Sequence, residues 1–124
     1  GCEPARIAKT MAFVVAGHAV LVVIAGDGKV DNPRFKAAFH TKAAMVRPDQ
    51  LVEQVGHPMG GVCPFAIRDD VPVYLDESLK RFDVVYPAAG TASSAVRLTV
   101  PELEHSVQNF AGWVDIAKGW RAEG

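Results

Sequence analysis

Lys9 is the strongest candidate in this sequence for a side chain that takes part in chemistry. It falls in a stretch over 7–15 that predicts a strand, with Lys9 on the same face as Ile7, Met11 and Phe13. An ammonium group among such residues must reach the mouth of a pocket, pair with an anion or lose its charge. A strand-end lysine that extends its ammonium group to solvent fits the same pattern. The residues alone therefore leave a functional and a structural lysine open.

A loop rich in glycine and proline is the second candidate. The stretch over 56–65 reads Gly-His-Pro-Met-Gly-Gly-Val-Cys-Pro-Phe, which predicts a tightly turned backbone. Around Gly60 and Gly61 the main chain could approach a ligand closely and present N–H groups to a carbonyl or phosphate oxygen. A tight connection without a ligand is the structural alternative. The loop is not a phosphate-binding P-loop, because no Gly-Lys-Ser/Thr follows it.

Three further kinds of site receive less support. Cys63 with His57 or another histidine could form a thiol nucleophile and its base, but no local signature of a cysteine hydrolase is present. The four histidines show no pair at helical ligand spacing, and the acidic turn over 27–31 has lysine at the third calcium-loop position. Asp76, directly after a predicted strand, could belong to a polar pocket wall, with a solvated turn as the default interpretation.

Length and composition indicate one domain. The chain has 124 residues, 49% of them hydrophobic and 22% charged, and a formal net charge of −1. A protein with this charge has no overall positive field that would bind long nucleic acid. Cys2 and Cys63 make no disulfide framework, and no signal peptide or apolar run of membrane-spanning length is visible, so a cytoplasmic protein is expected. The opening residues read like the exit of a helix, so we expect an N-terminal segment to be missing.

The pattern along the chain predicts an α/β (α+β) fold built on a mixed, strongly curved sheet flanked by helices. A helix capped by Asp31 should point Phe35, Ala38 and Phe39 inward, and a second should bury Leu51, Val52 and Val55. A tail with two tryptophans should pack back on the body. We expect strands over 7–15, 19–24, 43–46, 71–75, 82–86 and 95–99, and helices over 31–40, 48–55 and from 101.

Five motifs, in this order, resemble the YbaK and prolyl-tRNA synthetase-associated editing domains. They are Ala8-Lys9-Thr10, Gly-Asp then Val-Asp before a helix, Gly-x-x-x-Gly-Gly-Val-x-Pro-Phe, Val-Pro-Val-x-x-Asp-Glu-Ser, and a Tyr-x-x-x-Gly turn. The resemblance covers Arg6 to about Leu103. It implies a barrel-like sheet with a pocket beside the lysine strand, and hydrolysis of the ester that joins a wrong amino acid to the 3′ end of tRNA.

The resemblance also implies a set of site residues and partners. Lys9 matches the family lysine, and the family often has serine at Cys63, which argues against a thiol nucleophile. The implied partners are a tRNA acceptor end carrying a misattached small amino acid, such as one on tRNA-Pro, and a cognate synthetase; no cofactor, metal, membrane or DNA is implied. The implied catalytic residues are Lys9, Gly60 and Gly61, and the implied substrate-binding residues are Thr10, Val62, Cys63, Pro64, Phe65, Asp76, Ala88 and Gly90.

Two departures from the family pattern alter the expected specificity. The turn at 88–90 reads Ala-Ala-Gly where YbaK is more polar, and Arg97 stands nearest to a family acidic position. Specificity for cysteinyl-tRNA is therefore not expected. A non-catalytic module for aminoacyl-tRNA or a small ligand is the alternative function, and a protein-interaction domain is a third. RNA contacts are expected to be few, with candidates at Lys42, Arg47, Lys80 and Arg81.

Overall fold

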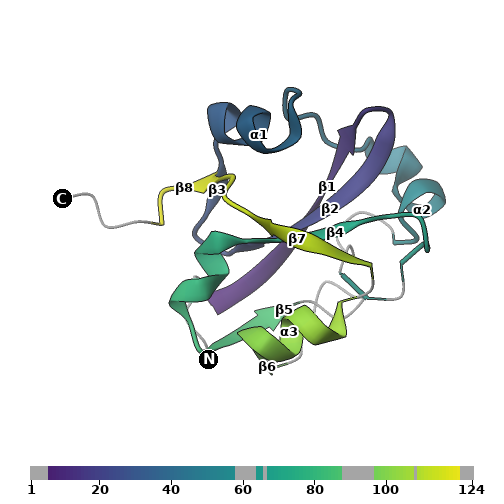
Figure 1. Cartoon of the computed structure of the whole chain (residues 1–124). Coiled ribbons are helices and arrows are strands. Elements are labelled where there is room, and N and C mark those ends of the chain that lie inside the picture. Colours follow the sequence, from purple (N-terminus) through teal and green to yellow (C-terminus); the bar gives the residue numbers. More distant parts are fainter. Residues whose placement is uncertain (1–5, 58–63, 66, 88–96, 108, 121–124) are drawn as a thin grey trace.

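A long antiparallel hairpin forms the centre of the molecule (Figure 1). The computed structural model describes residues 6–57, 64, 65, 67–87, 97–107 and 109–120. Strands β1 (Ile7–Val15) and β2 (His18–Ala25) pair from Ala8↔Ala25 to Val15↔His18. The turn between them uses left-handed backbone at Ala16 (φ 52°) and Gly17 (φ 80°), which suits a two-residue hairpin connection. Both predicted strands are confirmed.

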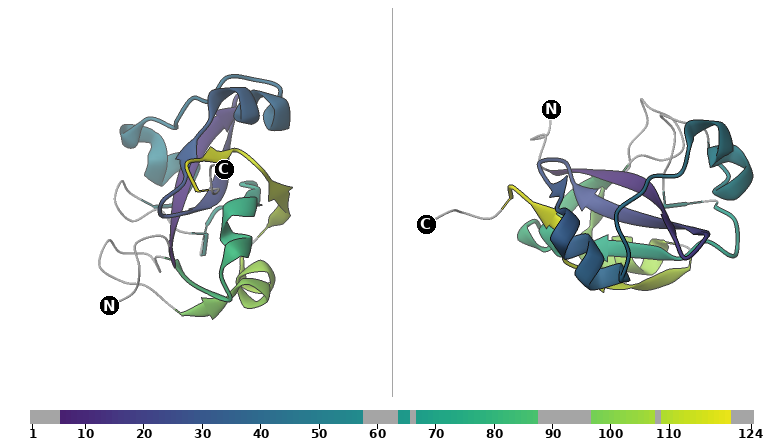
Figure 2. Two further views of the ribbon diagram at one scale, coloured as in Figure 1. Left: turned by 90° about the vertical axis from the view of Figure 1, so that its left-hand side faces the viewer. Right: turned by 90° about the horizontal axis from the view of Figure 1, so that it is seen from above.

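Four further strands extend the hairpin into a mixed sheet that curls round the core (Figure 2). The order is β6-β5-β1-β2-β4-β7, and the pairs β1–β5, β2–β4 and β4–β7 are parallel. The predicted mixed, curved sheet is confirmed. The added strands are β4 (Val73–Asp76), β5 (Val84–Pro87), β6 (Leu98–Thr99) and β7 (Phe110–Val114), and β3 (Lys29–Val30) pairs with β8 (Ala117–Lys118) in a small second sheet.

The hairpin has a packed core on each face. Helix α1 (Asn32–Phe39) covers one face, with the Phe35 ring 4.8 Å from the Phe13 ring. Asp31 caps the helix by accepting a hydrogen bond from the backbone N–H of Arg34, as the sequence predicted. The prediction for Ala38 was wrong: this residue is exposed, because only the Phe35 side of the short helix touches the sheet.

Two other predictions in the middle of the chain need correction. The segment 43–46 is not a strand; it makes only an isolated bridge between Met45 and Phe13. The predicted second helix is a 3₁₀ turn, η2 (Pro48–Gln50), followed by α2 (Leu51–Gln54). Leu51 is buried, but Val52 is 61% exposed, because one helical turn can present only one side to the core.

A buried carboxylate joins the centre of the sheet to the C-terminal segment. Asp76 is fully buried at the end of β4, where η3 (Glu77–Arg81) begins. Its Oδ2 accepts a hydrogen bond from Ser78 N (2.9 Å), and its Oδ1 accepts one from Ile116 N (2.8 Å). The Ser78 hydroxyl accepts from Ala25 N at 3.1 Å. The expectation of a solvated turn was therefore wrong, and we call Asp76 and Ser78 the buried clamp.

The sequence predicted a helix from residue 101, and the structure has one that begins one residue earlier. Helix α3 (Val100–Ser106) begins with a capping box, in which Thr99 and Glu102 each bond the other's backbone N–H. Its Leu103 is fully buried. Within the described ranges, no helix is long and apolar enough to cross a membrane.

Candidate active site

Lys9 lies near the start of β1 on the sheet face that α1 covers. It pairs with Ile24 of β2, and both residues share this face with Met11 and Phe13. The Lys9 side chain is partly buried. The predicted strand phase is thus confirmed: Lys9 shares the apolar face of β1 and is only partly buried there.

The outer edge of β1 has a gap beside Lys9. Strand β5 pairs with β1 only at Ile7 and Ala8. Farther along, Val14 N donates to Ala44 O (2.7 Å) and Val46 N donates to Ala12 O (3.0 Å). Between these two attachments, over 9–11, no described strand pairs with this edge. Because the even-numbered residues direct their backbone groups to this side, the main chain of Thr10 faces the gap.

Thr10 has a polar atom that the described part of the chain leaves unsatisfied. Its Oγ1 is buried and has no hydrogen-bond partner there. Its side chain points to the opposite sheet face from Lys9, the face on which Ala8 and Ala12 are buried. A buried hydroxyl without a partner costs about 1–3 kcal/mol, which a ligand oxygen or nitrogen could offset.

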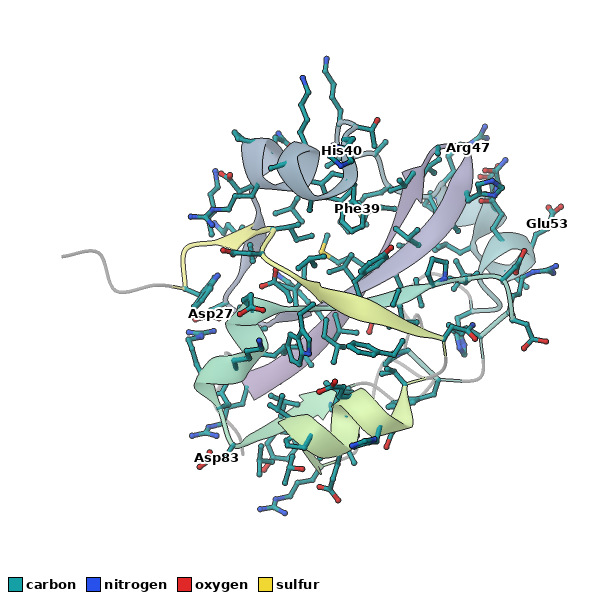
Figure 3. The ribbon with its side chains drawn as sticks, viewed as in Figure 1. Asp27, Phe39, His40, Arg47, Glu53 and Asp83 are labelled. Atoms are coloured by element: carbon teal, nitrogen blue, oxygen red, sulfur yellow. The ribbon has the colours of Figure 1, made fainter. Side chains whose placement is uncertain are left out.

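Asp27, labelled in Figure 3, is a carboxylate that the sequence did not single out as a site residue. The Arg81 guanidinium holds Asp27 through Nη1 (2.9 Å) and Nη2 (2.5 Å), and packs on the rings of Phe82 and Trp120. The hydrogen bond from Arg81 is the main reason that the pKa of Asp27 lies below its usual range, and the Lys9 charge also lowers it. The Gly-Asp pair among the resemblance motifs was the only signal for this carboxylate.

The predicted substrate-binding residues fall in different places. Pro64 is buried, and Phe65 packs against the core on the Thr10 side, where its carbonyl oxygen accepts a hydrogen bond from His57 Nε2 (2.7 Å). Asp76 belongs to the buried clamp, so its carboxylate does not form a pocket wall. Gly60, Gly61, Val62, Cys63, Ala88 and Gly90 lie outside the described residues.

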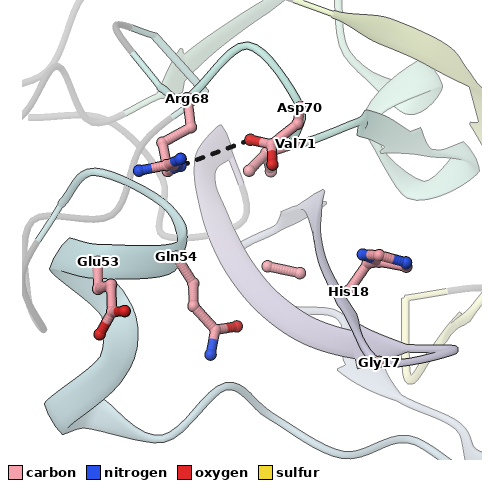
Figure 4. Close-up of a pocket in the computed structure, with 8 residues that line it drawn as sticks. Gly17, His18, Glu53, Gln54, Arg68, Asp70 and Val71 are labelled. Carbon is pink, nitrogen blue, oxygen red and sulfur yellow. Dashed lines mark ion pairs between the residues drawn. The ribbon is translucent and has the colours of Figure 1, made fainter.

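A polar hollow of about 290 Å³ lies at the other end of the hairpin (Figure 4). Glu53 and Gln54 of α2 face the hairpin turn across it, and an Arg68–Asp70 ion pair (3.5 Å) lies at its rim. The six residues of β1 that follow Lys9 separate it from this hollow, roughly 20 Å at 3.3 Å per residue. It is therefore distinct from the predicted site. Across the described segments, no three metal-ligating side chains gather.

Comparisons with known proteins agree with the curved mixed sheet and with the family that the sequence motifs resemble. The family description "Aminoacyl-tRNA editing domain" matches residues 1–105. The uncharacterized protein YwhH of Bacillus subtilis is 46% identical over 122 residues, 97% of this chain and 76% of YwhH. EbsC of Enterococcus faecalis, a candidate Cys-tRNA(Pro)/Cys-tRNA(Cys) deacylase, is 29% identical over 113 residues, 88% of this chain and 67% of EbsC. The crystal structure of a candidate trans-editing enzyme for prolyl-tRNA synthetase has a TM-score of 0.85 at 28% identity, covering 96% of this chain and 74% of that one.

Proposed function

The chain belongs to the aminoacyl-tRNA editing domain family, and from this membership we propose that it is a trans-editing deacylase. It hydrolyses the ester between a misattached amino acid and the 3′ end of a tRNA. The observation that carries the proposal is that Lys9, which the sequence resemblance matches to the family lysine, lies beside the gap in the β1 edge.

Lys9 supplies a positive charge to the reacting end of the substrate. It either anchors the 3′-terminal phosphate or ribose oxygen, or stabilises the negative charge that develops on the ester. These roles differ kinetically. Loss of an anchor that acts equally in ground and transition state raises KM, whereas loss of transition-state stabilisation lowers kcat.

Backbone N–H groups near Gly60 and Gly61 polarise the ester carbonyl in this mechanism. Thr10 contributes from the same stretch of β1, because its buried Oγ1 lacks a partner among the described residues. No side chain need form a covalent bond with the substrate, since positioning of the ester and a water molecule can supply much of the rate.

The substrate is a small amino acid on the wrong tRNA, such as one on tRNA-Pro. A synthetase gains only about 1–3 kcal/mol per methylene when it excludes a smaller amino acid. A second site that admits the small residue and rejects the larger correct one restores fidelity. EbsC and the structural neighbour, a candidate trans-editing enzyme for prolyl-tRNA synthetase, support this substrate class, and a cognate synthetase would then be a partner.

The test is release of free amino acid from a panel of mischarged tRNAs at catalytic amounts of protein. Lys9→Ala should lower kcat/KM by about 100- to 1000-fold, as the loss of one charge-stabilising group typically does. Lys29→Ala, an exposed lysine on β3, removes the same charge and serves as the matched control. Both variants should melt like the wild type. Near-normal turnover by folded Lys9→Ala would refute the role of Lys9, and binding without hydrolysis by the wild type would favour a non-catalytic module.

The same assay tests the expectation that neither a thiol nor a metal drives the reaction. Cys63→Ser should retain deacylase activity, because serine can fill the same space without a thiolate. A chelator should leave the rate unchanged. Inactivation of folded protein by either treatment would revive the thiol or metal alternative.

A further inference from the structure

One stretch of this chain is basic although the whole protein is slightly acidic. Residues 32–48 contain no aspartate or glutamate, whereas the full chain has 14 acidic residues and a net charge of −1. The same stretch holds Arg34, Lys36, Lys42 and Arg47. It comprises α1 and the segment that follows, on the sheet face where Lys9 lies.

The structure divides these four cations into two pairs. Arg34 Nη1 contacts Asp115 at 2.9 Å, and Arg47 Nη2 contacts Asp49 at 2.8 Å. Lys36 and Lys42 form no ion pair with any described residue. Both line one hollow of about 500 Å³, together with Asn32, Pro33 and Ala43. We call it the α1 hollow; it brings two uncompensated ammonium groups and a side-chain amide to one surface.

The cations on η3 differ from Lys36 and Lys42. Lys80 pairs with Glu77 at 3.0 Å and lies over the Trp113 ring at 4.5 Å. Arg81 is held by Asp27 and Trp120. A phosphate would have to displace these partners, whereas the α1 hollow is free of such competition among the described residues.

We propose that the α1 hollow binds backbone phosphates of the tRNA acceptor stem. This inference rests on the proposed function, which brings the 3′ end to Lys9. Phe13 follows Lys9 by four residues and contacts α1, so the hollow lies on the order of 15–20 Å from Lys9, from strand rise and helix diameter. A single-stranded acceptor end of about four nucleotides, at roughly 3.4 Å each, covers about 14 Å, so the first phosphates of the stem would fall close to the hollow.

The distinguishing experiment measures the binding of an uncharged acceptor-stem RNA hairpin as a function of salt. Each phosphate contact contributes about −0.9 to the slope of log K against log salt on a duplex. The double variant Lys36→Gln/Lys42→Gln should therefore flatten the slope by roughly 1.8. Between 50 and 200 mM salt, the wild type should then lose about 12-fold more affinity than the variant. This factor is the fourfold increase in salt concentration raised to the power of the slope difference, about 1.8.

Lys29→Gln/Lys118→Gln is the matched control, because it removes the same charge from two lysines of the β3–β8 sheet that do not line the α1 hollow. It should leave the slope within about 0.5 of the wild type. Equal flattening in both double variants, or no flattening in either, would overturn the inference. The RNA in this experiment carries no amino acid, so the binding measurement does not depend on deacylation. A wild type that fails to deacylate mischarged tRNA would contradict the proposed function alone.

Discussion

Replacement of Asp76 by alanine removes both acceptors of the buried clamp. The carboxylate is fully buried, and its two oxygens accept hydrogen bonds from the backbone N–H groups of Ser78 and Ile116. Alanine offers no hydrogen-bond acceptor in place of the carboxylate. Both N–H groups would then remain buried without a partner.

Each unsatisfied buried N–H costs about 1–3 kcal/mol, so Asp76→Ala should destabilise the protein by about 2–6 kcal/mol. A chain of this size loses about 3–5 °C of Tm per kcal/mol, which gives a loss of roughly 6–30 °C. Asp76→Asn keeps one acceptor and should lose about half as much. Ser78→Ala removes one acceptor, that of the Ala25 N–H, and should lose about 1–3 kcal/mol.

Thermal and urea unfolding followed by circular dichroism measure these losses. Asp70→Ala, at a side chain that is 77% exposed, is the control and should change stability by less than about 0.5 kcal/mol. An Asp76→Ala protein that melts within about 2 °C of the wild type would refute the clamp. So would an Asp76→Asn variant of unchanged stability that had lost deacylation, because that result would return the carboxylate to the substrate pocket.

The remaining predictions concern the β2–β3 turn and the hairpin. The folded pKa of Asp27 is lowered, chiefly by Arg81, so its stabilising effect is full above the unfolded value near 3.8 and is lost as pH falls through the folded pKa. The stability difference between wild type and Asp27→Asn should therefore shrink in urea titrations carried from pH 6 down to 3. Gly28→Ala should cost about 1–3 kcal/mol, because its Cβ would lie 2.9 Å from Ile24 Cγ2. Gly17→Ala meets no atom within 4 Å but has φ +80°, so its loss should be smaller, about 1–2 kcal/mol from backbone strain alone.

The sequence predicted the parts of the fold that depend on local patterns. The alternation in 7–15, the apolar run after His18 and the Asp31 cap each act within a few residues, and the structure has all three elements at nearly the expected bounds. The face on which Lys9 lies followed from the same alternation. The family was recognisable because its motifs stand in order along the chain.

Features that depend on distant partners were not predictable in the same way. Strand β7 contains Gly112 and no alternating apolar pattern, and it is a strand because β4 offers it a parallel edge. Asp76 resembles a turn residue until Ile116, 40 positions later, supplies a buried N–H. The Asp27–Arg81 pair likewise joins residues 54 positions apart. Sequence spacing carries no direct signal for such contacts.

The buried clamp also sets an order in time. During synthesis the β1–β2 hairpin emerges well before β8, so the small neighbouring strand β3 gains its partner only after residues 117–118 have been made. Asp31 N donates to Ile116 O, and Ile116 N donates to Asp76, so one late residue closes contacts with two early segments. A nascent chain that ends at residue 105, where the family match stops, would carry every predicted catalytic residue on an open framework. Activity should therefore appear on a translating ribosome only after residues 110–118 have emerged.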